Sequence, residues 1–113
     1  MESQWTVDPV WIHGDLESSN ILISDDQLVA VIDFGNCAVG DPACDLVMAW
    51  TFFDKDIRTK FRSAIEVDVD TWHRARAWAL WKGLFRMSRS IQSKNKEFDD
   101  AKRLVEDILT ISI

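Results

Sequence analysis

The first 54 residues of this 113-residue chain contain no lysine and no arginine. The first cation is Lys55, and ten acidic residues precede it. Residues 1–70 carry 14 acids and 4 bases, a net charge of −10, whereas residues 71–113 carry 5 acids and 9 bases, a net charge of +4. The acidic amino-terminal part argues against a nucleic-acid partner and is compatible with a metal ion and a cationic small molecule. An ordinary solvated acidic surface is the alternative, above all for the acids expected at turns and helix ends: Asp25, Asp26, Asp54 and Asp56.

The chain also has no apolar run that approaches the roughly 20 residues needed to span a bilayer. Residues 1–4 lack the charged and apolar regions of a signal peptide. We therefore expect a cytoplasmic protein without a membrane partner. The sequence has two cysteines, Cys37 and Cys44, with no metal-ligand spacing, so we expect both to be reduced and to act as small core residues. A hydrophobic content of 47%, with six Trp and six Phe, is enough to build a packed core.

Three polar motifs follow one another between residues 13 and 35. A His-Gly-Asp triplet at residues 13–15 is followed by Asn20 and then by an Asp-Phe-Gly triplet at residues 33–35. Two apolar runs, residues 21–23 and 28–32, flank a polar stretch between the last two motifs, which predicts strand, turn and strand. Because an antiparallel hairpin returns the chain to the end where it began, we expect Asn20 and the Asp of the second triplet to lie near each other.

The side chains of these motifs suit phosphoryl transfer. Mg²⁺ prefers hard oxygen ligands and takes only one or two carboxylates, which leaves positions for water and substrate phosphates. The Asp33 carboxylate and the Asn20 carbonyl oxygen fit that role. Asp15, on the loop before the hairpin, can accept the proton of an attacking hydroxyl. An Asp base, an Asn after four intervening residues and a metal-binding Asp-Phe-Gly are also the parts of a known phosphoryl-transfer template.

Residues 11–50 resemble the aminoglycoside phosphotransferase and choline kinase family, the small-molecule branch of the kinase-like fold. The resemblance rests on HGDLESSNIL at residues 13–22, VIDFG at residues 31–35 and GDPACDL at residues 40–46. It implies a kinase that uses ATP or GTP and phosphorylates a hydroxyl of a small molecule, aminoglycoside-like or otherwise amine-bearing.

In the site that the resemblance implies, Asp15 is the catalytic base, and Asn20 and Asp33 hold Mg²⁺. Two more residues are expected to support the loop. By the resemblance, Asp45 is buried and accepts hydrogen bonds from the loop backbone; it also falls in a first helical turn, where the helix dipole favours a negative charge. For His13 we favour a ring that bonds nearby backbone and fixes the loop over a metal ligand or a base.

A complete member of the family has a nucleotide-binding lobe before the His-Gly-Asp triplet, with a phosphate-binding lysine. Here twelve residues precede His13 and none is a lysine. We therefore expect the carboxy-terminal, catalytic-lobe portion of such an enzyme, with doubtful activity when isolated, and we identify no nucleotide-binding residue. The expected fold class is α+β and mostly α, a β-hairpin followed by about four helices. It forms one partial domain, with the loop, hairpin and metal motif in residues 1–40 and a helical part in residues 41–113.

The helical part begins at Asp41 and Pro42, a capping residue followed by a proline suited to the first helical position. Further helices are predicted over residues 56–65, 70–92 and 96–111. The long one carries an aromatic stripe that we expect in the core: Trp78, Trp81, Leu84 and Phe85. Its cations are expected on a charged outer face: Arg74, Lys82, Arg86 and Arg89. The last helix is predicted to bury Phe98, Ala101, Leu104, Val105, Ile108 and Leu109.

Two other functions stay open on the sequence alone. One is a non-catalytic remnant or interaction module, and the other is a metal-dependent phosphohydrolase in which Asp15 activates water. We also expect self-association, with a homodimer as the simplest closed form. In the family, helices that precede the His-Gly-Asp loop in the sequence cover part of the core of the lobe. The apolar residues expected to meet those helices are retained here, and a second copy of the chain could cover them. They include Trp11, Ile21, Leu22, Trp78, Trp81 and Phe85.

Overall fold

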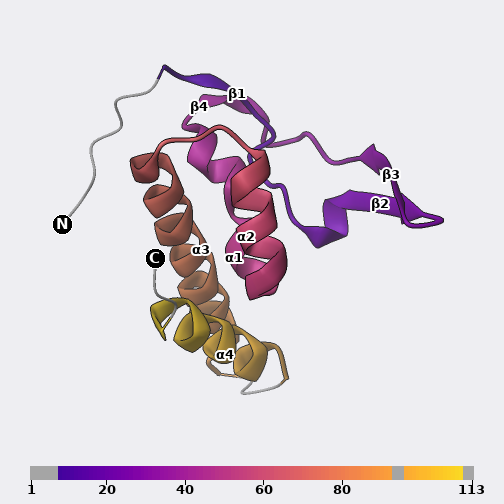
Figure 1. Cartoon of the computed structure of the whole chain (residues 1–113). Helices are drawn as coiled ribbons and strands as arrows, with labels where there is room; N and C mark the ends of the chain where they lie inside the picture. Colours follow the sequence, from indigo (N-terminus) through magenta and orange to yellow (C-terminus); the bar gives the residue numbers. More distant parts are fainter. Residues whose placement is uncertain (1–7, 93–95, 111–113) are drawn as a thin grey trace.

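The computed structural model describes residues 8–92 and 96–110, in which two small β-sheets precede four α-helices (Figure 1). One sheet is the hairpin of β2 (Ile21–Ser24) and β3 (Gln27–Val31), which projects away from the helices in Figure 1. The other pairs β1 (Val10–Ile12) with β4 (Ala38–Gly40). The predicted α+β fold, mostly helical and with a hairpin ahead of about four helices, is confirmed.

The hairpin turns tightly at Asp25 and Asp26. Both residues have left-handed backbone angles, with φ of 51° and 60°. Positive φ at both central residues characterises the turn whose twist matches that of two antiparallel strands, and aspartate tolerates this conformation better than most residues. Pairing runs from Ser24 and Gln27 beside the turn to Ile21 and Val31 at the open end. The open end of the hairpin therefore places Asn20 beside the chain that leads to Asp33.

The sheet of β1 and β4 was not predicted. Its strands have three residues each, and Trp11 pairs with Val39, 28 positions later in the sequence. A strand of three residues is too short to show an alternating pattern, and a partner so distant leaves no local turn signal. The pairing has a clear consequence for the site, because it closes a loop that contains both triplets and the hairpin.

The helix predicted at Asp41 is a 3₁₀ turn, η2 (Pro42–Leu46), followed by the short α1 (Met48–Thr51). The predicted cap is present, since an Asp41 side-chain oxygen accepts a hydrogen bond from the Ala43 N–H at 3.0 Å. The predicted helix start at Asp41 and Pro42 is present, but the first turn is 3₁₀, which apolar spacing over so few residues does not distinguish from an α-helix.

The three later helices lie close to their predicted ranges. They are α2 (Lys55–Ala64), α3 (Val69–Ser90) and α4 (Lys96–Thr110). The predicted last residue of α4, Ile111, lies outside the described residues. None of the described helices combines the length and the apolar character needed to cross a membrane.

The core forms where α3 packs against η2, α1 and α4. On α3 the buried positions are mostly small, including Ala75, Ala79 and Gly83. They let the helices approach closely: a Cβ on Gly83 would lie 2.8 Å from a methyl carbon of Val105 on α4. Larger side chains complete the core, among them Val47, Trp50, Trp72 and Ile108.

This packing corrects the prediction for the aromatic stripe of α3. Trp78, Trp81, Leu84 and Phe85 are not core residues, and between 39% and 53% of each is exposed. The helix buries its narrow alanine and glycine face, so the bulky face is left at the surface. There the aromatic rings pack on one another, with the Trp81 and Phe85 rings stacked at 5.4 Å.

Two smaller predictions of burial were also wrong. Leu109 on α4 is 60% exposed, although Ala101, Val105 and Ile108 are buried as predicted. Cys37 is exposed and Cys44 is partly buried, so the pair does not form a set of core residues. Both cysteines are free thiols, as expected. Burial, followed by the nearby Asp41 and Asp45 carboxylates, raises the pKa of the Cys44 thiol.

Candidate active site

The Asp45 side chain, in the 3₁₀ turn η2, binds the backbone of the His-Gly-Asp loop. One Asp45 carboxylate oxygen accepts from the His13 N–H at 2.8 Å, and the other accepts from the Gly14 N–H at 3.0 Å. Hydrogen bonds from backbone N–H groups to a carboxylate are stronger than those between neutral groups. The structure thus brings Asp45 to the loop, and both backbone donors are satisfied by a single side chain.

His13 connects the loop to the residue that follows β3. The residue is 7% exposed, and its Nε2 lies 2.8 Å from the Ile32 carbonyl oxygen. A carbonyl can only accept, so Nε2 carries the proton. Nδ1 then accepts from the Asp15 N–H at 3.1 Å. Both ring nitrogens are thus engaged by backbone, which is the arrangement favoured from the sequence over a metal ligand or a base.

Gly14 lets the two triplets meet. Its φ is +88°, a left-handed conformation that side chains rarely adopt, and a Cβ at this position would lie 2.3 Å from the Asn36 carbonyl oxygen. That contact is far too short for any side chain. A glycine in the middle of the first triplet is therefore what allows the loop to lie against the segment that follows Asp-Phe-Gly.

Asn20 links the loop to the hairpin. Its side-chain NH₂ donates to the Asp15 carbonyl oxygen at 2.8 Å and to Asp15 Oδ2 at 3.3 Å. Its backbone carbonyl accepts from the Ile32 N–H at 2.9 Å, next to Asp33. The structure therefore brings Asp15, Asn20 and the backbone leading to Asp33 together at the open end of the hairpin.

Asp33 has an unusual backbone. Its φ is +60°, and the residue is exposed. Asp25 and Asp26 at the hairpin turn adopt the same conformation, which aspartate tolerates better than most residues. The Asp33 carboxylate lies at the surface, where a ligand can reach it.

The oxygen donors of Asn20 and Asp33 fit Mg²⁺. Because the Asn20 NH₂ faces Asp15, its side-chain oxygen is the part left for another partner. One amide oxygen and one carboxylate supply few ligands, so phosphate oxygens and waters would have to complete an octahedral shell. Across residues 8–92 and 96–110, no group of three or more His, Cys, Asp and Glu side chains is arranged to hold a metal ion.

Lys82 and Arg86 of α3 also reach the loop, which the sequence analysis missed. The Lys82 ammonium lies 3.7 Å from Asp15 Oδ1, and the Arg86 guanidinium lies 3.4 Å from a Glu17 carboxylate oxygen. The two cations are four residues apart and so share one face of the helix. The two ion pairs join residues 67 and 69 positions apart in the sequence, so no local pattern indicates them. The only signal in the sequence was the four-residue spacing of the two cations and the two-residue spacing of the two acids.

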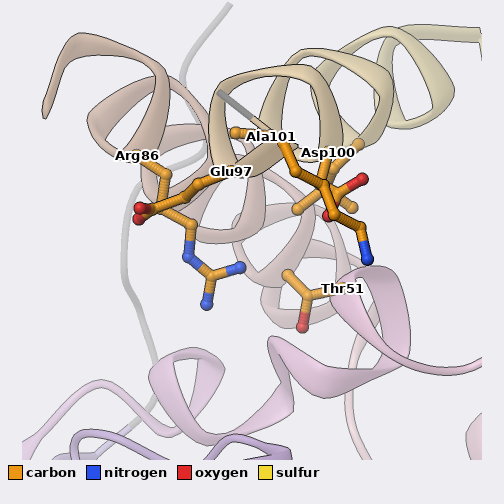
Figure 2. A pocket seen from close by; sticks show the side chains of 7 residues that line it. Thr51, Arg86, Glu97, Asp100 and Ala101 are labelled. Carbon is orange, nitrogen blue, oxygen red and sulfur yellow. The ribbon is translucent and has the colours of Figure 1, made fainter. Parts of the chain in front are cut away.

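A pocket of about 500 Å³ lies between α1, α3 and α4 (Figure 2). Figure 2 shows Thr51 and Arg86 facing the space beneath α4, with acidic side chains on the α4 side. The lining residues are Thr51, Arg86, Lys96, Glu97, Asp100, Ala101 and Leu104. Arg86 also pairs with Glu17, so the pocket and the loop share one side chain.

Comparison with known proteins agrees with the geometry of the loop. No curated protein and no solved structure matches the chain. The family model described as the phosphotransferase enzyme family matches residues 1–78, well over half of the sequence, and the matched stretch contains the loop, the hairpin and η2. The resemblance inferred from the motifs is thereby confirmed: the chain belongs to the phosphotransferase enzyme family.

Proposed function

We propose that this chain carries the catalytic loop and the metal ligands of an ATP-dependent phosphotransferase that acts on a hydroxyl of a small molecule. The observation that carries the proposal is the bonding at the open end of the hairpin. There the Asn20 side chain holds Asp15, while the Asn20 backbone holds the chain next to Asp33. Asn20 thus connects the proposed base to the segment that carries the second proposed metal ligand.

In the proposed reaction, Asp15 accepts the proton of the acceptor hydroxyl as its oxygen attacks the terminal phosphorus of ATP. A bond forms between the acceptor oxygen and the terminal phosphorus, and the bond between that phosphorus and the bridging oxygen breaks, so that ADP leaves. Asn20 keeps the Asp15 carboxylate oriented by donating to Oδ2. Mg²⁺ bound at Asn20 and Asp33 would supply charge neutralisation for the phosphate oxygens.

We propose an amine-bearing acceptor, aminoglycoside-like in its chemistry. The net charge of −10 on residues 1–70 supports a cationic molecule. The pocket of Figure 2, with a volume of about 500 Å³, could hold a small molecule, and its lining is of mixed charge, with Glu97 and Asp100 beside Arg86 and Lys96. The Arg86 contact to Glu17 places this pocket next to the catalytic loop.

ATP would also need cationic groups that residues 1–54 do not supply. We propose that a nucleotide-binding lobe works together with this chain in a longer protein. The 113 residues alone should therefore transfer phosphate very slowly, because phosphoryl transfer depends mostly on positioning and on charge stabilisation.

The test is an Asp15→Asn substitution in a protein that joins a nucleotide-binding lobe of the family to this chain. We expect phosphoryl transfer from ATP to aminoglycosides to fall on the order of 10²-fold or more, the usual contribution of a general base. Asp26→Asn, at the exposed hairpin turn, is the matched control and should leave the rate unchanged. An unchanged rate in Asp15→Asn contradicts the assignment, and transfer to water that matches transfer to the acceptor indicates a phosphohydrolase instead.

A further inference from the structure

We propose that Lys82 is a phosphate-binding residue of this site, whose ammonium group binds the oxygens of the phosphoryl group beside Asp15. The inference rests on the proposed phosphotransferase function and adds to it a cation supplied by α3, outside the sequence motifs.

The first observation is the separation of the two charges. Lys82 Nζ lies 3.7 Å from Asp15 Oδ1, and the two side chains are 21% and 31% exposed. That distance allows attraction between the charges but is longer than a hydrogen bond. An ammonium group has three donors, so Lys82 can bind an anion without giving up a hydrogen bond to Asp15.

The second observation is what the neighbouring cations do. Three arginines are used in structural contacts: Arg58 donates to the Ala49 carbonyl at 2.6 Å, Arg74 to Asp41 at 2.8 Å and Arg76 to the Ile108 carbonyl at 2.7 Å. Arg86 lies over Glu17. Among the cations of the described residues, Lys82 is therefore the one that the structure places at the base.

The third observation is that the Lys82 backbone is held firmly. Lys82 precedes Gly83, which is buried against Val105 so closely that even a Cβ would collide. The close approach of α3 to α4 fixes the helix at this turn. Core packing thus fixes the backbone from which the Lys82 side chain reaches Asp15.

The position of Lys82 beside Asp15 suits both charge states of the base. While Asp15 is ionised, Lys82 neutralises part of its charge. The phosphoryl oxygens are negative throughout the transfer, so when Asp15 accepts the hydroxyl proton and its carboxyl becomes neutral, the ammonium is left to pair with those oxygens. A cation that already lies beside the reacting atoms can stabilise their charge.

The experiment measures binding of tripolyphosphate with Mg²⁺ to the 113-residue chain, followed by the backbone amide shifts of Asp15, Asn20 and Asp33. Lys82→Gln should weaken binding roughly tenfold, the effect of one charge-assisted hydrogen bond, and Lys82→Arg should restore most of it. Lys102→Gln, on the exposed face of α4, is the control for overall charge. The amide spectrum of each variant in the absence of ligand checks that its fold is intact.

The possible outcomes separate this inference from the proposed function. If Asp33→Asn weakens binding and Lys82→Gln does not, the role of Lys82 is wrong and the metal and phosphate site stands. If Lys102→Gln weakens binding as much as Lys82→Gln, the effect is one of net charge, and the inference is again wrong. If the unmodified chain shows no saturable binding, both the inference and the proposed site are contradicted.

Discussion

Asp45 stabilises the His-Gly-Asp loop through its carboxylate. It accepts two backbone hydrogen bonds, from His13 and Gly14. Its removal would leave two partly buried donors without their partner, and hydrogen bonds to charged groups contribute about 1.5–3 kcal/mol each. We expect Asp45→Ala to lower the free energy of unfolding by about 3 kcal/mol or more, the sum of two such bonds at the low end of the range, measured by urea denaturation.

The matched control for this prediction is Asp99→Ala. Asp99 is exposed in the first turn of α4, where an acid interacts favourably with the helix dipole, so the loss should stay below about 1 kcal/mol. Hydrogen exchange at the His13 and Gly14 amides supplies a local readout, and protection should be lost there first. Equal stabilities for the two variants would show that the loop does not depend on Asp45.

At the residue scale, the sequence predicted that the hairpin brings the Asn20 and Asp33 segments together, and the bond between Asn20 and Ile32 confirms this proximity. The roles of Asp15, Asn20 and Asp33 in catalysis and metal binding stay predictions. The ring of His13 was expected to bond nearby backbone, and it does so at Ile32. Lys82 could not be identified, because its approach to Asp15 depends on how α3 packs, which no local pattern records.

Among the elements, the contact between α3 and α4 depends on Gly83. Replacing a helical glycine by alanine normally gains about 1 kcal/mol in helix propensity. Here the new methyl group would lie 2.8 Å from a Val105 methyl carbon, and overpacking costs about 1–3 kcal/mol. We therefore expect Gly83→Ala to destabilise the chain by about 1 kcal/mol in net terms, measured by thermal or urea unfolding.

A double-mutant cycle identifies the cause. In a Val105→Ala background the obstructing methyl group is gone, so Gly83→Ala should become neutral or stabilising there. If Gly83→Ala has the same effect in both backgrounds, the close approach of the two helices is not what limits residue 83.

The error on the aromatic face of α3 has a physical origin in helix packing. Periodicity identifies which residues share a helix face but not which face is buried. On α3 the face with Ala75, Ala79 and Gly83 packs inward because small residues allow close helix contacts, and the bulkier Trp81 face is left outside. The pairing of β1 with β4 was missed for a related reason, because it joins short segments far apart in the sequence.

For the whole molecule, we propose that the exposed aromatic face of α3 is covered by a second copy of the chain. Trp78, Trp81 and Phe85 are each 39–53% exposed on a single helix face, and large exposed apolar patches are uncommon on soluble monomers. The opposite net charges of residues 1–70 and 71–113 favour pairing of unlike parts between two copies. A dimer with two-fold symmetry is the simplest closed arrangement.

Sedimentation at micromolar concentration tests this proposal. The unmodified chain should sediment as a dimer, and Trp81→Glu should shift it toward the monomer by placing a charge within the apolar face. Lys102→Glu, on the exposed side of α4, should leave the dimer intact. A clean monomer that binds no hydrophobic dye would show that the aromatic face needs no partner.

At this scale the sequence predicted the family, because its motifs lie within residues 1–78. It also predicted the fold class, because the hairpin and the helices each have a local sequence pattern. The pocket between α1, α3 and α4 could not be predicted from the sequence. Thr51, Arg86 and Glu97 belong to three separate helices, and only their packing creates the shared space.

The most direct test of the account is a Mn²⁺ titration of the chain followed by the loss of backbone amide signals. We predict weak binding, because phosphate oxygens are needed to complete the metal shell, with the signals of Asn20 and Asp33 broadened first. Asp33→Asn should abolish that selectivity. Asp26→Asn, at the other end of the hairpin and with the same left-handed backbone, should preserve it. Broadening that is unchanged in Asp33→Asn, or that is centred on Asp26, would contradict the assignment of the metal site and the phosphotransferase mechanism built on it.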